Sequence, residues 1–416
     1  MYKRLSAKNI IMFGLLLLVG VMVAAPQEVV AGAAAGLSLW ALCVLPALLP
    51  FFIVSDLLTE LGAVDFLGAL CEPLMRPVFR LPGCAAFVLA VVHTAGMPIG
   101  AALTSRLRES GQLSRIEGER LLAFSCNPSP GFMFGAVAGG MLGVPALGAV
   151  LAGSVYAANL IVGFVFRFYG GRDKGGARGE KSAREGFSAR AAHGMRAVQL
   201  KRRSFGEILA ASIKKNVAVL LQIGGYMVFF SVIIRMLKTM TVLALISHIP
   251  AKIAGLWGAG AQMPESGLVL GTGAELGMEA VLTGLIEQTL GCRAVVDAMP
   301  TMAAQVGAIA FLMGFGGLCV FAQVSGFAAE TDLRLRPFLA ARLLHGSLAL
   351  ALSQVALRHL HLSVMVPSES VAYLSSHQYT VQFWHVFRWN LLFFGVVMVM
   401  LVFFWSRARL RRVSRD

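Results

Sequence analysis

The sequence predicts an all-α polytopic membrane protein with about eight transmembrane helices and two re-entrant hairpins in an inverted repeat. First, 57% of the 416 residues are hydrophobic, only 14% are charged, and the mean hydropathy is +0.75. A soluble domain carries roughly 25% charged residues. Second, helix-breaking residues interrupt three long apolar stretches. Third, basic residues gather between the apolar runs, as they do in the cytoplasmic loops of membrane proteins.

Apolar runs of about 20 residues are long enough to cross a bilayer as one helix. The first run could be taken for a signal peptide, but Pro26 directly follows the small residues and makes a poor cleavage site. We therefore expect a retained helix. The predicted spans are 10–26, 33–58, 120–142, 146–168, 214–236, 301–328, 337–357 and 387–405.

The interruptions predict where the backbone leaves helical geometry. Two apolar runs, 83–103 and 267–288, contain Gly, Pro or Glu near the centre and are predicted to be re-entrant hairpins. A break exposed to lipid would leave backbone groups unpaired, so breaks persist only inside protein or beside a watery cavity. The broken segments are His93–Gly100, Asn127–Gly131 and Gly271–Gly277.

The basic loops predict orientation and domain organisation. The segment 170–204 carries ten basic and three acidic residues, and we expect it to be cytoplasmic, like both termini. The predicted units are an N-terminal transmembrane helix (1–28), a first repeat (29–169), the basic loop (170–204), a second repeat (205–360), and a C-terminal transmembrane helix with a basic tail (361–416).

The two repeats are predicted to have opposite topology. The helix at 33–58 runs outside to inside before its hairpin, whereas the helix at 214–236 runs inside to outside. At a constant offset of 187 residues, the interruption Asn127–Gly131 aligns with Gly314–Leu318. The matched pairs in this register are Ala123 with Ala310, Phe124 with Phe311, Phe134 with Phe321, Val137 with Val324, and Gly139 with Gly326.

Candidate solute-binding residues lie at the breaks of the first repeat. His93, Thr94 and Gly96 belong to the first hairpin, where freed amides and the Thr94 hydroxyl could hold a carboxylate. Asn127 and Ser129 accompany two prolines that leave upstream carbonyls without helical partners. The alternative interpretation is purely structural: a packed turn in the first case and a self-satisfied kink in the second.

The second repeat adds further candidates. Glu275 and Glu279 are deep in an apolar run, where a carboxylate costs roughly 2.5–3.5 kcal/mol, and are candidates for coupling to Na⁺ or H⁺. A shallow hairpin that lets both reach water is the alternative. Arg342 could attract an anion or extend to the membrane surface. The remaining candidate ligand contacts are Thr272, Gln323 and Ser325.

Other classes of function are disfavoured. The net charge of +15 is explained by basic loops, so we expect no nucleic-acid partner. The chain has no Walker A lysine motif, H-E-x-x-H, G-x-S-x-G or metal-ligand spacing, so we expect neither an enzyme nor a metal or other cofactor. The six cysteines include no C-x-x-C pair. The expected partners are a small anionic solute and the lipid bilayer, and a homo-oligomer is left open.

Several motifs resemble those of the sporulation integral membrane protein family (YlbJ type). They are Leu45–Phe52, Glu72–Pro77, Gly96–Ala101, Asn127–Gly135, Gly316–Val324 and Arg336–Gly346. That family belongs to the nucleoside-recognition (Gate) superfamily, related to concentrative nucleoside transporters. The resemblance implies inverted repeats, paired hairpins and a substrate site at mid-depth. It further implies movement of dipicolinate, a small aromatic dicarboxylate, from the mother cell toward the forespore.

We therefore predict a secondary transporter or facilitator of a small anionic aromatic solute, in the cell membrane or the outer forespore membrane. One alternative is a nucleoside or nucleobase transporter, which would rely more on amide and carboxylate contacts. Another is a non-transporting membrane scaffold for sporulation or envelope assembly, which would act through the basic loop.

Overall fold

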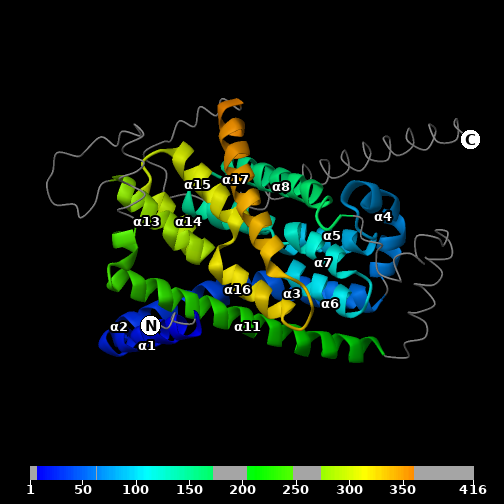
Figure 1. Cartoon of the computed structure of the whole chain (residues 1–416), viewed down its shortest axis with the longest axis horizontal. Helices are drawn as coiled ribbons and strands as arrows, with labels where there is room; N and C mark the ends of the chain where they lie inside the picture. Colours follow the sequence, from blue (N-terminus) through cyan, green and yellow to red (C-terminus); the bar gives the residue numbers. More distant parts are fainter. Residues whose placement is uncertain (1–6, 62, 172–203, 247–272, 360–416) are drawn as a thin grey trace, which may run out of the picture.

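The chain folds into helices throughout the part that the structure describes. The structure is a computed structural model, and it describes residues 7–61, 63–171, 204–246 and 273–359. The N-terminal helices are α1 (Ala7–Ala24), α2 (Pro26–Leu39), the π-helix η1 (Trp40–Val44), α3 (Leu45–Glu60) and α4 (Ala63–Phe79). In Figure 1, α1 and α2 lie at the lower left and α4 lies at the right.

Two groups of helices then repeat the same order. The first contains α5 (Cys84–Ala95), α6 (Ile99–Glu109), α7 (Arg115–Phe124), η2 (Gly131–Met141) and α8 (Leu147–Phe166). The long helix α11 (Phe205–Thr239) separates it from α13 (Gly273–Ile286), α14 (Gln288–Ala298), α15 (Met302–Phe315), α16 (Gly317–Ala328) and α17 (Leu335–His359). Each group has two short helices, an interrupted helix and a long helix.

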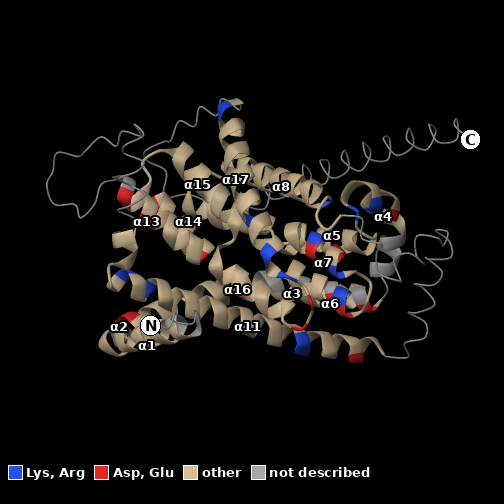
Figure 2. Ribbon diagram, viewed as in Figure 1, with Lys and Arg blue, Asp and Glu red and all other residues tan. Residues whose placement is uncertain are grey.

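Four segments of the described chain are long and apolar enough to cross a membrane: α8, α11, the α15–α16 pair (Met302–Ala328) and α17. Two bent pairs raise this to six if each is one span: Met12–Ala24 with Pro26–Leu42, bent by 103°, and Leu70–Phe79 with Cys84–Ala95, bent by 86°. The described residues therefore contain four to six candidate spans. The predicted span at 387–405 lies outside them, so the estimate of eight stays a prediction. Most of the ribbon is uncharged, with charge gathered around α4, α6 and α7 (Figure 2).

Buried apolar residues form two main clusters. One joins α3 to α7 with α11, and its fully buried members include Leu81, Val88 and Leu121. The other surrounds η2, α8 and α15, with α17 packed against both α8 and α15. The clusters meet where the interrupted helices lie, so the non-helical backbone is placed inside protein, as the cost of unpaired backbone groups requires.

The two predicted hairpins have different outcomes. The first contains the expected interruption, because α5 and α6 are separated by Gly96, Met97 and Pro98. For the second, the described part of the predicted break is wrong, and Gly271 and Thr272 lie outside the described residues. Gly273–Gly277 lies within the continuous helix α13, and the interruption is at Glu287, between α13 and α14. The prediction took these glycines as a sign of a turn. A glycine inside a helix destabilises it by only about 1 kcal/mol relative to alanine, so glycines alone do not end a helix.

Candidate functional site

The turn between α5 and α6 packs directly on the break in the next helix. Gly96 has φ of 90°, and a Cβ added there would lie 2.7 Å from the Ser129 amide nitrogen. A Cβ on Gly100 would lie 1.6 Å from the Ser125 carbonyl oxygen. Only glycine allows such close approach. The two interruptions predicted in the first repeat therefore form one unit.

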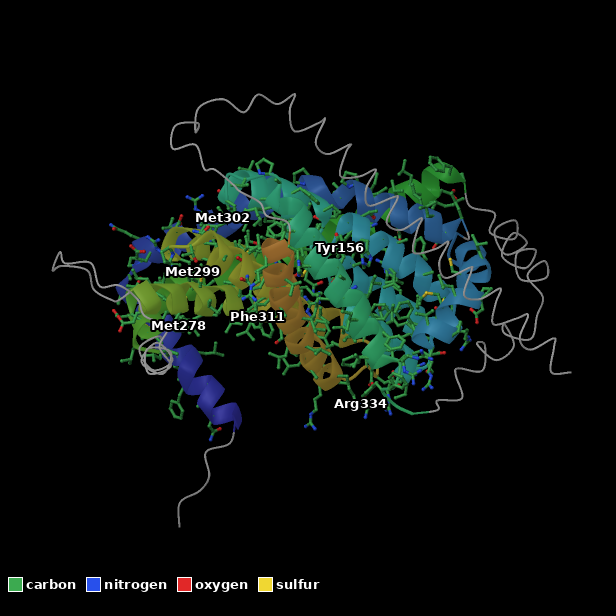
Figure 3. The ribbon with its side chains drawn as sticks, turned by 90° about the horizontal axis from the view of Figure 1, so that it is seen from above. Tyr156, Met278, Met299, Met302, Phe311 and Arg334 are labelled. Carbon is green, nitrogen blue, oxygen red and sulfur yellow. The ribbon has the colours of Figure 1, made fainter. Side chains whose placement is uncertain are left out.

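Side chains from α5 and α8 complete this unit. The Tyr156 ring lies 4.8 Å from the His93 ring, and its hydroxyl donates to the carbonyl of Pro128 at 3.1 Å. His93 is buried, with Nδ1 2.7 Å from the Leu89 carbonyl oxygen. Tyr156 lies near the middle of the molecule when it is seen from above (Figure 3). Sequence reasoning missed Tyr156, because a tyrosine in an apolar helix is usually an ordinary core residue.

The predicted residues of the break have unequal roles. Asn127 is fully buried, and neither its amide nitrogen nor its amide oxygen has a hydrogen-bond partner among the described residues. Ser129, in contrast, accepts a hydrogen bond from the Phe132 amide at 3.2 Å and so supports the start of η2. Thr94 is exposed and bonds to the carbonyls of Ala90 and Val91 in its own helix. Of these predicted residues, Asn127 is therefore the one whose hydrogen-bonding groups are not used by any described residue.

The second interruption also contains buried polar groups. Glu287 is 5% exposed, and its carboxylate accepts hydrogen bonds from the amides of Thr289 at 3.1 Å and Leu290 at 2.7 Å. Gln288 is buried, and its Oε1 has no partner among the described residues. A Cβ on Gly317 would lie 3.4 Å from the Gln288 amide nitrogen, which places this interruption beside the α15–α16 break.

Arg342 connects the interrupted helices of the two groups. It is 1% exposed, and its Nε and Nη2 donate to the carbonyls of Phe315 at 3.0 Å and Met313 at 3.1 Å. Its Nη1 donates to the carbonyl of Cys126. Gly316 ends α15 in the left-handed region, which leaves the last carbonyls of that helix available.

The Cys126 carbonyl is available for a parallel reason. Its helical partner would be the amide of residue 130, but Pro130 has no N–H. Sequence analysis predicted that the prolines would free such carbonyls, and the structure shows a guanidinium bound there. Arg342 forms no ion pair with any described residue, so three carbonyl dipoles stabilise its charge without neutralising it.

One turn further along α17, His345 extends this polar region to α8. It is fully buried, and its Nε2 lies 2.8 Å from the Val155 carbonyl oxygen. Its Nδ1 has no partner among the described residues. Asn159 on α8 is also fully buried, with both amide atoms unpartnered in the described part of the chain. Buried polar groups are normally hydrogen-bonded, so His345 and Asn159 are exceptions that call for an explanation.

The other predicted residues take no part in the contacts given above, or lie outside the described chain. Gln323 is buried and its amide contacts the Cys319 sulfur at 3.3 Å, whereas Ser325 is half-buried. Glu275 and Glu279 are half-buried residues of α13, two to three helical turns before the interruption at Glu287. Thr272 lies outside the described residues. In the described chain, no cluster of His, Cys, Asp and Glu is arranged to hold a metal.

Glu287 has the same sequence feature that made Glu275 and Glu279 candidates. It follows the apolar run Val281–Ile286 and is an acidic residue in a hydrophobic stretch, as Glu275 and Glu279 are. The structure buries Glu287 and leaves the other two partly exposed. The burial of these three carboxylates could not be predicted from the sequence, because the predicted interruption ends at Gly277, ten residues before Glu287.

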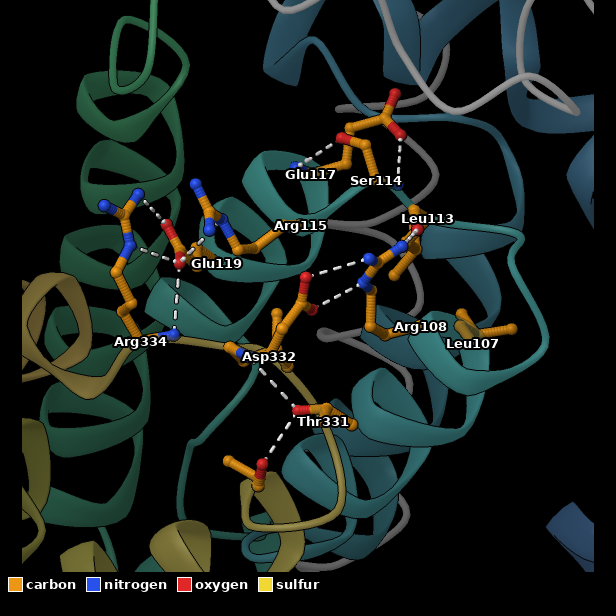
Figure 4. A network of polar contacts seen from close by, with 12 residues as sticks. Leu107, Arg108, Leu113, Ser114, Arg115, Glu117, Glu119, Thr331, Asp332 and Arg334 are labelled. Atoms are coloured by element: carbon orange, nitrogen blue, oxygen red, sulfur yellow. Dashed lines mark hydrogen bonds and ion pairs between the residues drawn. The ribbon is translucent and has the colours of Figure 1, made fainter.

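A polar network joins the two groups of helices at one end of α17 (Figure 4). Arg108 makes two hydrogen bonds to Asp332, at 2.8 and 3.0 Å, and these bonds hold the pKa of Asp332 below its usual value. Burial opposes ionisation of Glu119. Hydrogen bonds from Arg334 and Tyr169 outweigh that opposition, and the pKa of Glu119 is lowered.

Comparison with known proteins identifies relatives. A family model described as "Gate: Nucleoside recognition" matches residues 41–172. A protein of Bacillus subtilis (strain 168) named "Sporulation integral membrane protein YlbJ" is 38% identical over 332 residues, which are 80% of this chain and 78% of that protein. No solved structure matches the chain. The residues of this chain that match the family model include the turn between α5 and α6, the α7–η2 break and α8.

Proposed function

Because the chain belongs to the YlbJ family of sporulation integral membrane proteins, we propose that it is a secondary transporter or facilitator of a small anionic aromatic solute. The solute we propose is dipicolinate, moved from the mother cell toward the forespore. The chain is an integral membrane protein, and its apolar helices agree with that assignment.

The observation that carries the proposal is the environment of Arg342. A buried guanidinium held between two interrupted helices is a fixed positive charge, and it pairs with no carboxylate of the described residues. An anionic solute would offset that charge at the point where both breaks meet. Asn127 directly follows Cys126 in the chain, and its unpartnered side-chain amide would contribute hydrogen bonds to the solute.

The repeated helix order supports transport by alternating access. In each group, two short helices precede an interrupted helix, and the breaks at Ser125–Pro130 and Gly316 correspond within the 187-residue offset. We propose that the two groups form an inverted repeat whose hairpins move against α8 and α17. Paired repeats with broken helices are the usual architecture of secondary transporters that bind solute near the middle of the bilayer.

Roles are proposed for the remaining candidates on the same basis. His93, Gly96 and Asn127 would shape the solute site from the first group, with Thr94 and Ser129 supporting the local backbone. Gln323, Ser325 and Thr272 would contribute from the second group. Glu275 and Glu279 remain candidates for coupling to Na⁺ or H⁺, and Glu287 joins them as the carboxylate that is buried at an interruption.

Reconstitution tests the proposal. Purified protein in liposomes should take up labelled dipicolinate in a saturable manner, measured with and without Na⁺ and pH gradients. Arg342→Lys keeps the charge but loses the fork of donors, and should lower uptake. Arg342→Gln should lower uptake further. The matched control is Arg336→Gln, an exposed arginine of the same helix, which should retain uptake.

Asn127→Ala separates binding from folding. Because the Asn127 amide has no partner among the described residues, its removal should leave thermal stability within about 1 kcal/mol while uptake falls about tenfold. Equal loss of stability and uptake would point to a structural role. No saturable flux of dipicolinate or nucleosides by the wild-type protein would reject transport itself.

A nucleoside is the second candidate solute, favoured by the match to the nucleoside-recognition family model over residues 41–172. The same liposomes should then take up uridine in preference to dipicolinate. Deleting residues 170–204 distinguishes either transporter from a membrane scaffold. Sporulation should survive that deletion if the helices transport a solute, and should fail if the basic loop recruits partners.

A further inference from the structure

Two arginines without a carboxylate partner in the described chain meet beside Phe168, just after α8. The guanidinium carbon of Arg80 lies 5.5 Å from the centre of the Phe168 ring. That of Arg167 lies 5.3 Å from the same ring and 5.1 Å from the Phe164 ring. Other arginines at this end of the molecule bind carboxylates: Arg76, Arg106, Arg108 and Arg334.

A third, buried arginine holds this pair in position. Arg120 is 3% exposed and donates to the carbonyl of Arg80 at 3.2 Å. It also donates to the carbonyls of Tyr169 at 2.9 and 2.6 Å and of Gly171 at 2.9 Å. Arg120 thus ties the backbone after α4 to the backbone after α8. The side chains that project from both segments are held close together as a result.

Unused donors remain in the pair. Arg80 Nη1 donates to the Arg167 carbonyl at 3.4 Å, which brings one guanidinium beside the main chain of the other arginine. Arg167 Nε is buried and has no hydrogen-bond partner among the described residues. Two like charges in contact with one ring repel each other, so a bound anion would stabilise their arrangement.

The surroundings indicate which anion. α8 is a candidate membrane span that ends at Phe166, and Phe164 and Phe168 are 48% and 59% exposed. Aromatic rings and arginines at the end of a span lie at the level of the lipid headgroups. A guanidinium fork matches the oxygens of a phosphate, and the exposed rings offer an apolar surface for acyl chains.

We propose that Arg80 and Arg167 form a binding site for the phosphate of an anionic phospholipid, with Phe164 and Phe168 against its acyl chains. A free phosphate would share the charge but would gain nothing from the exposed phenylalanines. The site lies apart from Arg342 and is independent of the transported solute. Its occupation would fasten the end of α8 to one leaflet of the membrane.

Native mass spectrometry of the full chain in detergent tests this site. Phosphatidylglycerol and phosphatidylcholine are added at equal concentration. The wild-type protein should retain phosphatidylglycerol preferentially, and R80Q/R167Q should retain about tenfold less. R293Q/R336Q is the charge-matched control, because both of its arginines are exposed and lie on α14 and α17. This control should match the wild type.

Further arms keep the proposal falsifiable. Excess inorganic phosphate should not displace the lipid, and displacement would assign the pair to free phosphate instead. If R80Q/R167Q does not fold, Phe168→Leu is compared with Phe13→Leu, a similarly exposed phenylalanine of α1. Phe168→Leu should weaken lipid retention and Phe13→Leu should not. Equal retention of phosphatidylglycerol in the wild type and the Arg80/Arg167 or Phe168 variants would overturn the site.

Discussion

Arg334 donates three hydrogen bonds to the carboxylate of Glu119, one from its backbone amide at 3.1 Å and two from its guanidinium at 2.9 and 3.1 Å. Glu119 is buried, whereas the side chain of Arg334 is 51% exposed. The Arg108–Asp332 pair lies close by (Figure 4). Both contacts join the segment around α6 and α7 to the loop before α17, so they connect the two groups of helices at one end.

Replacing the buried member of this network should destabilise the fold. Glu119→Gln removes the charge that three donors from Arg334 and one from Tyr169 share. Arg334 can turn to water, so we expect a loss of about 1–3 kcal/mol, below that of a fully buried pair. Thermal unfolding in detergent measures it. Asp297→Asn, which breaks an exposed pair with Arg293, should change stability by less than about 0.5 kcal/mol. Equal effects would contradict this ranking.

The same network predicts the dependence of stability on acid. The pKa values of Glu119 and Asp332 lie below their ordinary values of about 4. The folded state therefore binds protons less readily than the unfolded state, and the network stabilises the fold fully above about pH 4 to 5. That contribution is lost as pH falls through the lowered pKa values. The difference in melting temperature between wild type and Glu119→Gln should hold from pH 7 to 5 and shrink below pH 4. A constant difference would exclude the linkage.

Helix breaks made by proline could be predicted from the sequence. Pro128 and Pro130 lack the amide hydrogens that would continue the helix, and the interruption between α7 and η2 lies where they predict it. The turn at Gly96–Pro98 follows from the same chemistry. These effects are local, so residue type alone determines them.

The depth and partners of charged residues could not be predicted in the same way. Arg342 could equally have reached the membrane surface, and only tertiary packing places it between carbonyls from Cys126, Met313 and Phe315. Glu287 was missed because the glycines at 273 and 277 suggested an earlier turn. Such glycines are compatible with a helix when tertiary packing stabilises it sufficiently. The contribution of tertiary packing cannot be predicted from the local sequence.

The close approach of the first turn to the α7–η2 break predicts a severe effect of one methyl group. A Cβ on Gly100 would lie 1.6 Å from the Ser125 carbonyl oxygen, so Gly100→Ala must separate the two segments. We expect a cost of about 3 kcal/mol or more, or misfolding. Gly153→Ala is the control, because a Cβ there meets nothing within 4 Å and should stabilise α8 by up to about 1 kcal/mol. Thermal unfolding of both variants measures the two effects. A Gly100→Ala variant as stable as the wild type would disprove the contact.

Glu287 gives the sharpest test of ion coupling. Its carboxylate is buried where α13 ends and α14 begins. It accepts hydrogen bonds from two backbone amides and forms no ion pair with a basic residue of the described chain. A buried carboxylate in that position is a candidate to take up H⁺ or Na⁺ during transport. Glu287→Gln keeps one oxygen as acceptor, so the cap of α14 should weaken by only about 1 kcal/mol.

Uptake by Glu287→Gln should therefore continue but lose its dependence on the Na⁺ or pH gradient. Glu279→Gln and Glu275→Gln serve as comparisons, because both residues are partly exposed in α13 and each change removes one charge. Uptake by these two variants should keep its ion dependence if burial at the interruption is what matters. An unchanged ion dependence in Glu287→Gln, together with a loss in either comparison, would return the coupling role to α13. The same gradient-driven uptake in proteoliposomes measures all three variants side by side.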